Sequence, residues 1–410
     1  MSAGFIPEQP VYGPGRGTTN SARPIKRYVR TYRVLQCLSR LRFETCLDVG
    51  GAEGYTAALI ERQLEARCAV ADARPEALAF AREHYGLPGV AIDAHHLPFR
   101  TGSFDVVLST ETVEHLPHPV EAMLEMARVA RKAVLVSTCE ARPSRCLSWF
   151  SRKLADYGTA GGHINFFTAQ DFRSVLGGPT RALNQLIKPG LSRSSSQLLR
   201  YGGSDRDEIL DGLRRITWTD AFIPGSRGIV AFRVLDPRAE RERPTLDDDA
   251  ILEAILDHVL EPGTRGAGTG RPGGWLHERL ACPSCLLSLE EGPPFRCPSC
   301  GLEAGTEEGV PILRPIPRRL DTFDRERYQG TLEKVGLTRE TVEATKKRLE
   351  TRRGVTSPRL RSALRLGRRT VQTLEGVRRT AIYLGSRKRE RPSVTAESRE
   401  RTTEEGEGWR

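Results

Sequence analysis

The stretch LDVGGAEG, Leu47–Gly54, joins a short apolar run to a helical pattern through a glycine-rich turn. A strand is expected at Cys46–Val49, and a helix is expected to follow at Gly54–Leu64. Glycines at such a junction let backbone amides approach a ligand at the N-terminus of the helix. The stretch therefore predicts a strand–turn–helix unit that binds a ligand.

Strands and helices alternate outward from this turn. Further strands are expected at 67–72, 90–92, 104–109, 133–137 and 228–235, and further helices at 75–84, 119–130 and 168–176. Strands separated by helices of about ten residues pair in parallel through crossover connections. The alternation predicts an α/β fold, a doubly wound and mostly parallel sheet.

The residues around the turn restrict the ligand. A dinucleotide fingerprint read from Gly50 needs a small residue at its sixth position, which is Tyr55 here. Asp48 before the turn repels a pyrophosphate and suits a cationic or zwitterionic ligand. Asp72, at the end of the second strand, is placed to accept hydrogen bonds from ribose hydroxyls.

These motifs resemble the class I S-adenosylmethionine-dependent methyltransferases, over roughly residues 42–178. Asp48, Gly50 and Gly54 match the first motif of that family, and Ala52 replaces its middle glycine. Four further segments match the small-molecule branch: Ile92–Ala94, Leu97–Phe99, Gly102–Asp105 and Glu114–Leu116. The resemblance implies a Rossmann-like sheet of seven strands and S-adenosylmethionine as the cofactor.

By the same resemblance, the glycine turn cradles the methionine part of the cofactor, Asp72 holds the ribose, and Asp93 with Ala94 holds the adenine. The expected cofactor-binding residues are Asp48, Gly50, Gly51, Gly54, Asp72, Asp93, Ala94 and Thr110.

Two histidines are candidates for the general base that a hydroxyl acceptor needs. His115 follows the fourth strand, at the sheet edge where open α/β folds bind ligands. His163 lies in the segment Gly161–Phe167 after the fifth strand, in a loop expected to cover the pocket. The alternative for each is a histidine that caps or packs a loop.

The cysteines form a second site. Cys282, Cys285, Cys297 and Cys300 follow the pattern CxxC–x11–CxxC, which predicts four thiolates around one structural zinc ion, Zn²⁺. The flanking runs Leu280–Pro283 and Gly309–Leu313 resemble a family of small zinc-ribbon proteins, some of which bind and activate methyltransferases acting on RNA or a release factor. The alternatives are an inert folding module and an unrelated partner-binding ribbon.

Composition and charge set the domain boundaries. No run approaches 18 apolar residues, so a membrane-spanning helix is not expected. Residues 318–410 carry 25 Lys and Arg against 14 Asp and Glu, which sets this region apart as a basic tail. The segments expected are a disordered N-terminus (1–24), the methyltransferase domain (25–236), a helix and Gly-rich linker (237–274), the zinc ribbon (275–317) and an Arg-rich helical or disordered tail (318–410).

The tail is basic and amphipathic in its central part. Residues 352–391 hold 13 cations and two acids, a pattern suited to an anionic membrane surface or to RNA phosphates. A solvated, partly disordered extension is the alternative. The chain shows no secretory signal, so a cytoplasmic location is expected, peripheral to a membrane if the tail binds one.

The sequence as a whole predicts a methyltransferase that acts on an oxygen or nitrogen atom of a small molecule, glycan or lipid precursor. The alternatives are a methyltransferase of RNA or a translation protein, with the ribbon as activator in cis, and a non-catalytic scaffold. The acceptor atom and the oligomeric state stay open.

Overall fold

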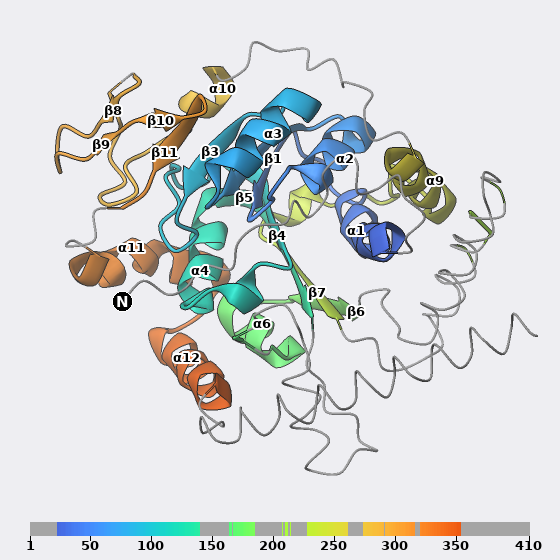
Figure 1. The fold of residues 1–410 in the computed structure, drawn as a ribbon. Coiled ribbons are helices and arrows are strands. Elements are labelled where there is room, and N and C mark those ends of the chain that lie inside the picture. The colour runs from blue at the N-terminus through green and yellow to red at the C-terminus, as the bar shows by residue number, and fades with distance from the viewer. Residues whose placement is uncertain are drawn as a thin grey trace, which may run out of the picture. The chain divides into compact units, whose positions relative to one another are not determined.

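The structure is a computed structural model. It describes residues 23–139, 164–165, 167–184, 228–260, 274–290, 292–315 and 320–353, with Asp207, Leu210, Asp211 and Arg214. All of these belong to one compact unit, Met1–Gly354 (Figure 1).

Helices and strands alternate as the sequence predicts. The strands are β1 (Thr45–Val49), β2 (Arg67–Asp72), β3 (Gly89–Ile92), β4 (Phe104–Thr110), β5 (Ala130–Cys139), β6 (Arg181–Asn184), β7 (Gly228–Val234), β8 (Phe295–Arg296), β9 (Glu303–Ala304), β10 (Thr306–Glu307) and β11 (Val310–Leu313). The α-helices are α1 (Arg23–Leu38), α2 (Tyr55–Leu64), α3 (Pro75–Tyr85), α4 (Pro119–Val129), α6 (Ala169–Leu176), α9 (Asp248–Leu260), α10 (Gly274–His277), α11 (Leu320–Val335) and α12 (Arg339–Arg353). Two single-turn 3-10 helices lie at η1 (Val113–His115) and η2 (Pro237–Ala239).

The main sheet has the order β10-β11-β3-β2-β1-β4-β5-β7-β6. Strands β1 to β5 are parallel to one another, and β7 runs antiparallel to both β5 and β6. The strand order reverses between β1 and β4, so their carboxyl ends border the crevice where open α/β sheets bind ligands.

The sheet corrects the expectation of seven strands, because two strands of the cysteine module extend it to nine. Strand β11 pairs in parallel with β3, with Ile312 opposite Ala91 and Leu313 opposite Ile92 (Figure 1). Strand β10 then pairs antiparallel with β11. The module is therefore continuous with the main sheet.

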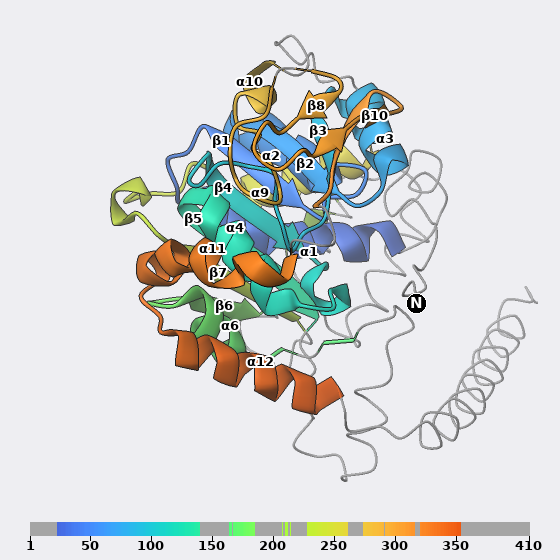
Figure 2. The same ribbon diagram turned by 90° about the vertical axis from the view of Figure 1, so that its left-hand side faces the viewer.

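Helices cover both faces of the sheet. One buried cluster joins one face to α1, α2, α3 and α9, and includes Leu35, Ile60 and Ile255. The other joins the opposite face to α4, α6, α11 and α12, and includes Met126 and Val342. Figure 2 shows α11 lying along α4, and α12 below α6.

The region after the module corrects the expected tail. Residues 320–353 form α11 and α12, whose side chains Tyr328, Val335 and Leu349 belong to the buried core. The tail was expected to be helical or disordered, and these residues are helical but packed against the core. Residues 354–410 of the expected tail lie outside the described residues, as do residues 261–273 of the Gly-rich linker. None of the described helices is long and apolar enough to cross a membrane.

Candidate functional site

The glycine turn lies between β1 and α2, at the switch point of the sheet. Asp48, the penultimate residue of β1, is 1% exposed, and neither of its carboxylate oxygens has a hydrogen-bond partner among the described residues. Burial is the main cause, and the charge of Asp72 the second, of a pKa for Asp48 that is raised to about 8. A buried carboxyl group without a partner is costly to ionise, and a cation placed beside it removes that cost.

The backbone of the turn leaves no room for side chains. A Cβ atom on Gly50 would lie 2.3 Å from Thr112 Oγ1, and one on Gly51 would lie 2.7 Å from Asp48 Cγ. Gly50 and Gly54 have φ angles of 74° and 76°, which glycine adopts without strain. Ala52 shares this left-handed region at 48°, so the alanine in place of a glycine is strained.

Asp72 braces the turn from the end of β2. One carboxylate oxygen accepts from the Ala52 N–H at 2.9 Å, and the other accepts from the Arg74 N–H at 3.0 Å. Arg74 Nε also donates to this second oxygen, at 3.4 Å, so the oxygen bound to the Ala52 N–H is the one with a lone pair left for a ligand hydroxyl. The structure thus brings Asp72 next to Asp48 and the glycine turn, although Asp72 follows Asp48 by 24 residues in the sequence.

The loop after β3 holds a third carboxylate, Asp93. Asp93 Oδ1 accepts from the His95 N–H at 2.9 Å and contacts His95 Nδ1. Burial alone would raise the pKa of Asp93, but His95 outweighs it and lowers the pKa to about 2. The His118 N–H donates to His95 Nε2 at 3.3 Å, so the tautomer with a proton on Nδ1 is the one that satisfies both contacts. Ala94, between these residues, is buried.

The two predicted general bases differ in what the structure shows of them. His115 is exposed and ends the 3-10 turn η1, just beyond β4. His163 lies outside the described residues. Thr110 ends β4 half-buried, and its carbonyl oxygen accepts from Thr112 Oγ1 at 3.2 Å. The sheet therefore places His115 and Thr110 at its carboxyl edge.

Sequence reasoning missed the residue that holds this edge. Asn165 is 1% exposed, and its Nδ2 donates to the carbonyl oxygens of Val113 at 3.0 Å and of Leu116 at 2.7 Å. The N–H groups of Ile164 and Asn165 both donate to the Glu114 carbonyl oxygen. The only sequence signal was the presence of Asn165 in the segment proposed to cover the pocket.

These residues fit S-adenosylmethionine. The unpartnered Asp48 suits the ammonium group of the methionine part, and the tight glycine turn leaves the backbone open to the ligand. Asp72 offers an acceptor for a ribose hydroxyl, and Asp93 with buried Ala94 offers a mixed polar and apolar surface for a base.

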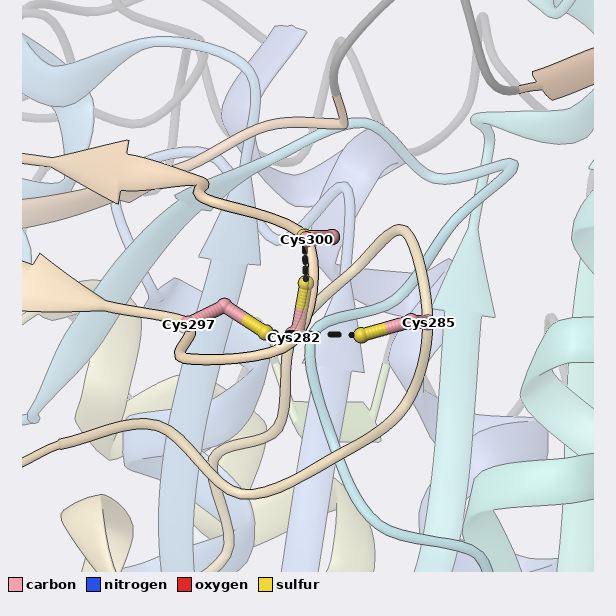
Figure 3. Close-up of side chains that lie close together, drawn as sticks. All are labelled: Cys282, Cys285, Cys297 and Cys300. Carbon is pink, nitrogen blue, oxygen red and sulfur yellow. Dashed lines mark hydrogen bonds between the residues drawn. The ribbon is translucent and has the colours of Figure 1, made fainter.

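The four predicted ligand cysteines converge in the C-terminal module (Figure 3). Their Sγ atoms all lie within 4.8 Å of one another, with Cys282 to Cys300 and Cys285 to Cys297 at 3.4 Å each. A tetrahedral zinc ion with Zn–S bonds of about 2.3 Å separates its sulfur atoms by about 3.8 Å. The cluster is therefore compact enough for one zinc ion.

Both cysteine turns have the same backbone form. The residue after the second cysteine is left-handed in each, Leu286 at a φ angle of 61° and Gly301 at 71°. The Leu286 N–H donates to the Cys282 carbonyl oxygen, and the Gly301 N–H donates to that of Cys297. Two matching turns that face each other are typical of a four-cysteine zinc site.

Residues 47–137 match the family described as "Methyltransferase domain". The match spans the glycine turn, Asp72, Asp93 and the turn after β4, and supports a class I S-adenosylmethionine-dependent methyltransferase domain.

Curated relatives carry the same class of activity in their names. Over 137 residues the chain is 32% identical to 2-methyl-6-phytyl-1,4-hydroquinone methyltransferase 2, chloroplastic, of Oryza sativa subsp. japonica. This match covers 32% of this chain and 39% of that protein. Over 128 residues it is 28% identical to the phthiotriol/phenolphthiotriol dimycocerosates methyltransferase of Mycobacterium leprae (strain TN), covering 30% of this chain and 47% of that protein. The chain thus spans less than half the length of these two relatives.

Among solved structures, the chain is similar to one in the complex between the Haloferax volcanii Trm112 methyltransferase activator and a methyltransferase. The identity is 16%, the match covers 52% of this chain and 91% of that chain, and the TM-score is 0.35.

Proposed function

We propose that this protein is an S-adenosylmethionine-dependent methyltransferase that acts on an oxygen or nitrogen atom of a small molecule, glycan or lipid precursor. The observation that carries the proposal is the buried, unpartnered carboxyl group of Asp48 under a glycine turn at the switch point of the sheet. The ionised carboxylate of Asp48 is costly in the free protein because it has no partner, and a cationic ligand beside it removes that cost.

Each site residue has a separate task in this proposal. When bound, S-adenosylmethionine supplies a methyl group on a positively charged sulfur, which is transferred in line to the acceptor. Asp48 holds the ammonium group, Asp72 the ribose hydroxyls, and Asp93 the base. Because the chemistry depends on alignment, fixing the cofactor at three points contributes to the rate by positioning.

The acceptor binds beyond the carboxyl ends of β4 and β5 in this proposal. His115 lies at that edge and is exposed, so it can reach an acceptor in solution and take its proton. His163 is the second candidate on sequence grounds. The names of the relatives from rice and Mycobacterium leprae specify a phytyl hydroquinone and dimycocerosates, and we extend from them to an apolar, lipid-like acceptor here.

Cofactor binding tests the proposal. Calorimetry with S-adenosylhomocysteine compares the wild-type chain with Asp72→Ala and with Glu83→Ala, an exposed carboxylate on α3 that serves as control. We expect Asp72→Ala to weaken binding by about 1–3 kcal/mol, because a buried acceptor is lost, and Glu83→Ala to leave it unchanged. No binding by folded wild-type protein would refute the proposal and favour a non-catalytic scaffold.

A second candidate is a methyltransferase of RNA or of a translation protein, with the cysteine module as its activator in cis. The observation that favours it is the pairing of β11 with β3, directly before Asp93. Transfer of a labelled methyl group to total RNA and to ribosomal protein tests this candidate. Labelling of a lipid extract alone would contradict it.

Of the basic residues 352–391, those from 354 onward lie outside the described part of the chain, and a role at an anionic membrane surface is a proposal from the sequence. Full-length protein is expected to co-sediment with anionic vesicles at low salt and to be released as salt screens the charges. Equal sedimentation with neutral vesicles would contradict it.

A further inference from the structure

A buried charge cluster connects three parts of the chain. Its centre is Glu125 on α4, whose side chain is fully buried, and it pairs with Arg128 and Arg327, each 2% exposed. Arg128 binds Glu125 through Nε at 2.9 Å and Nη2 at 2.8 Å, and Arg327 binds it through Nε at 2.8 Å and Nη2 at 2.6 Å. Two bidentate pairs fix the carboxylate and both guanidinium groups.

Arg327 also reaches the cysteine module. It lies on α11, 202 residues after Glu125, and its Nη1 donates at 2.6 Å to the carbonyl oxygen of Pro283. Pro283 lies between Cys282 and Cys285, in the first of the two cysteine turns. One guanidinium group therefore binds both α4 and the backbone of a metal-ligating turn.

The other side of the cluster holds the loop after β3. Glu125 Oε2 accepts from the Leu97 N–H at 2.9 Å, and Arg128 Nη2 donates to the Leu97 carbonyl oxygen at 2.9 Å. Tyr328, the neighbour of Arg327 on α11, donates from its hydroxyl to the His95 carbonyl oxygen at 3.4 Å. Both ends of the short segment 95–97, which follows Asp93, thus depend on this cluster and on α11.

We propose that Arg327 is a positioning residue for the nucleoside end of the cofactor site, and that through it zinc binding at the four cysteines and cofactor binding at Asp93 support each other. The proposal rests on the proposed cofactor site. The path is continuous: the Pro283 carbonyl oxygen, Arg327, Glu125, Leu97 and the loop that begins at Asp93.

The geometry explains why Arg327 is a suitable point of coupling. Without it, Glu125 keeps Arg128 as its partner, so the buried carboxylate stays compensated and the fold can persist. The Pro283 carbonyl oxygen, by contrast, loses its charged donor, and Glu125 loses the second clamp that orients it toward Leu97. A less ordered loop must pay more conformational entropy when the ligand binds.

Coupling of this kind is reciprocal. If zinc favours cofactor binding by a given factor, the cofactor must favour zinc retention by the same factor. A contribution of Arg327 to the stability of the fold alone predicts no such link. Loss of the link in a folded variant therefore separates the positioning role from a purely structural one.

The experiment uses the full-length, zinc-loaded protein with Arg327→Met and Arg327→Lys. Arg348→Met is the matched control, because Arg348 connects α12 to Asp171 on α6 without touching the cysteine turn or the 93–97 loop. Calorimetry gives the affinity for S-adenosylhomocysteine, transfer of zinc to a chromogenic chelator gives the release rate with and without that ligand, and thermal unfolding reports folding.

We expect Arg327→Met to bind S-adenosylhomocysteine about tenfold more weakly, while ligand no longer slows zinc release. Arg327→Lys keeps the charge but lacks the planar fork, so it should be impaired as well and provides a second test if the methionine variant does not fold. Arg348→Met should retain wild-type affinity and ligand-dependent zinc retention.

Wild-type affinity and ligand-dependent zinc retention in a folded Arg327 variant would overturn the inference. A variant that melts earlier yet shows both properties unchanged would do the same, because it would assign Arg327 a structural role only. Absence of S-adenosylhomocysteine binding by the wild-type protein would instead refute the proposed function, so the two failures are distinguishable.

Discussion

The pKa of Asp48 leads to a direct test of the cofactor site. Burial and the neighbouring Asp72 raise this pKa to about 8, so at pH 7 about 90% of the free protein carries Asp48 in its protonated form. An ammonium group beside the carboxylate favours the charged form. Ligand binding at pH 7 should therefore release about 0.9 proton for each S-adenosylhomocysteine molecule bound.

The same pKa sets the pH dependence of affinity. Below pH 8 only the ionised fraction of Asp48 is ready for the ligand, and this fraction rises from about 0.3% at pH 5.5 to about 9% at pH 7.0 for a pKa of about 8. Affinity should increase about thirtyfold over this range, which corresponds to about 2 kcal/mol. The α-amino group of the ligand stays largely protonated below pH 7, so it adds little to the slope.

The free protein should show the opposite trend in stability. Because the folded-state pKa of Asp48 lies above its unfolded value of 3.8, the contribution of this group to stability is fully present below about pH 4. It is lost as the pH rises through about 8. Because affinity rises with pH, bound ligand should stabilise the fold more at pH 7.0 than at pH 5.5.

Calorimetry at pH 5.5, 6.25 and 7.0, in two buffers of different ionisation enthalpy, measures affinity and proton release together. Asp48→Asn is the control, because it keeps the shape of the side chain and removes the titration, while Asp93 and the nearby histidines remain. The variant should bind weakly and with little pH dependence. A wild-type affinity that does not change with pH, or an equal slope in Asp48→Asn, would refute the reasoning.

Three further predictions concern the surroundings of the site. Ala52→Gly should raise the free energy of unfolding by about 0.5–1 kcal/mol in urea titrations, because glycine relieves the left-handed backbone at a φ angle of 48°; a lower value would contradict the assigned strain. Asn165→Ala should lower the free energy of unfolding by about 1–3 kcal/mol, because the carbonyl oxygens of Val113 and Leu116 lose the Asn165 amide as a donor. It should also reduce methyl transfer more than it reduces the affinity for S-adenosylhomocysteine. Unchanged thermal unfolding would argue against this role of Asn165. Burial would raise the pKa of Glu125, but Arg128 and Arg327 lower it to about 2, so the stabilising contribution of Glu125 is present above pH 4.5 and is lost as the pH falls to about 2. Glu125→Gln should abolish this acid-dependent part of the free energy of unfolding in urea titrations. A variant that retains it would assign the titration to another group.

Much of the main sheet could be predicted because its signals are local. Each strand from β1 to β4 is a short apolar run, and each is followed by a turn or a helical pattern in the next few residues. The glycine turn and Asp72 could be placed at one edge because parallel strands end on the same side. Their contact through the Ala52 N–H follows from that arrangement.

The remaining parts depend on contacts between distant segments. Strand β11 has four residues, including Pro311, and nothing in its own sequence indicates that it pairs with β3, more than 200 residues earlier. Helix α11 was assigned to the tail because the region is rich in arginine. The sequence does not show that Arg327 is buried, since burial of an arginine depends on a partner such as Glu125, which lies on another helix.

The buried contacts show why residues 274–353 belong to the same compact unit as the main sheet. The edge of β3 is covered by β11, so its backbone groups have partners and do not form an open sheet edge. Arg314, just after β11, donates from Nη2 to the carbonyl oxygen of Ala73, next to Asp72. At the adenine side, Arg327 and Tyr328 hold the cluster and the loop that follow Asp93. Residues from the module and from α11 thus support the two carboxylates proposed to hold the nucleoside, and in this proposal the four-cysteine module is part of the framework of the cofactor site.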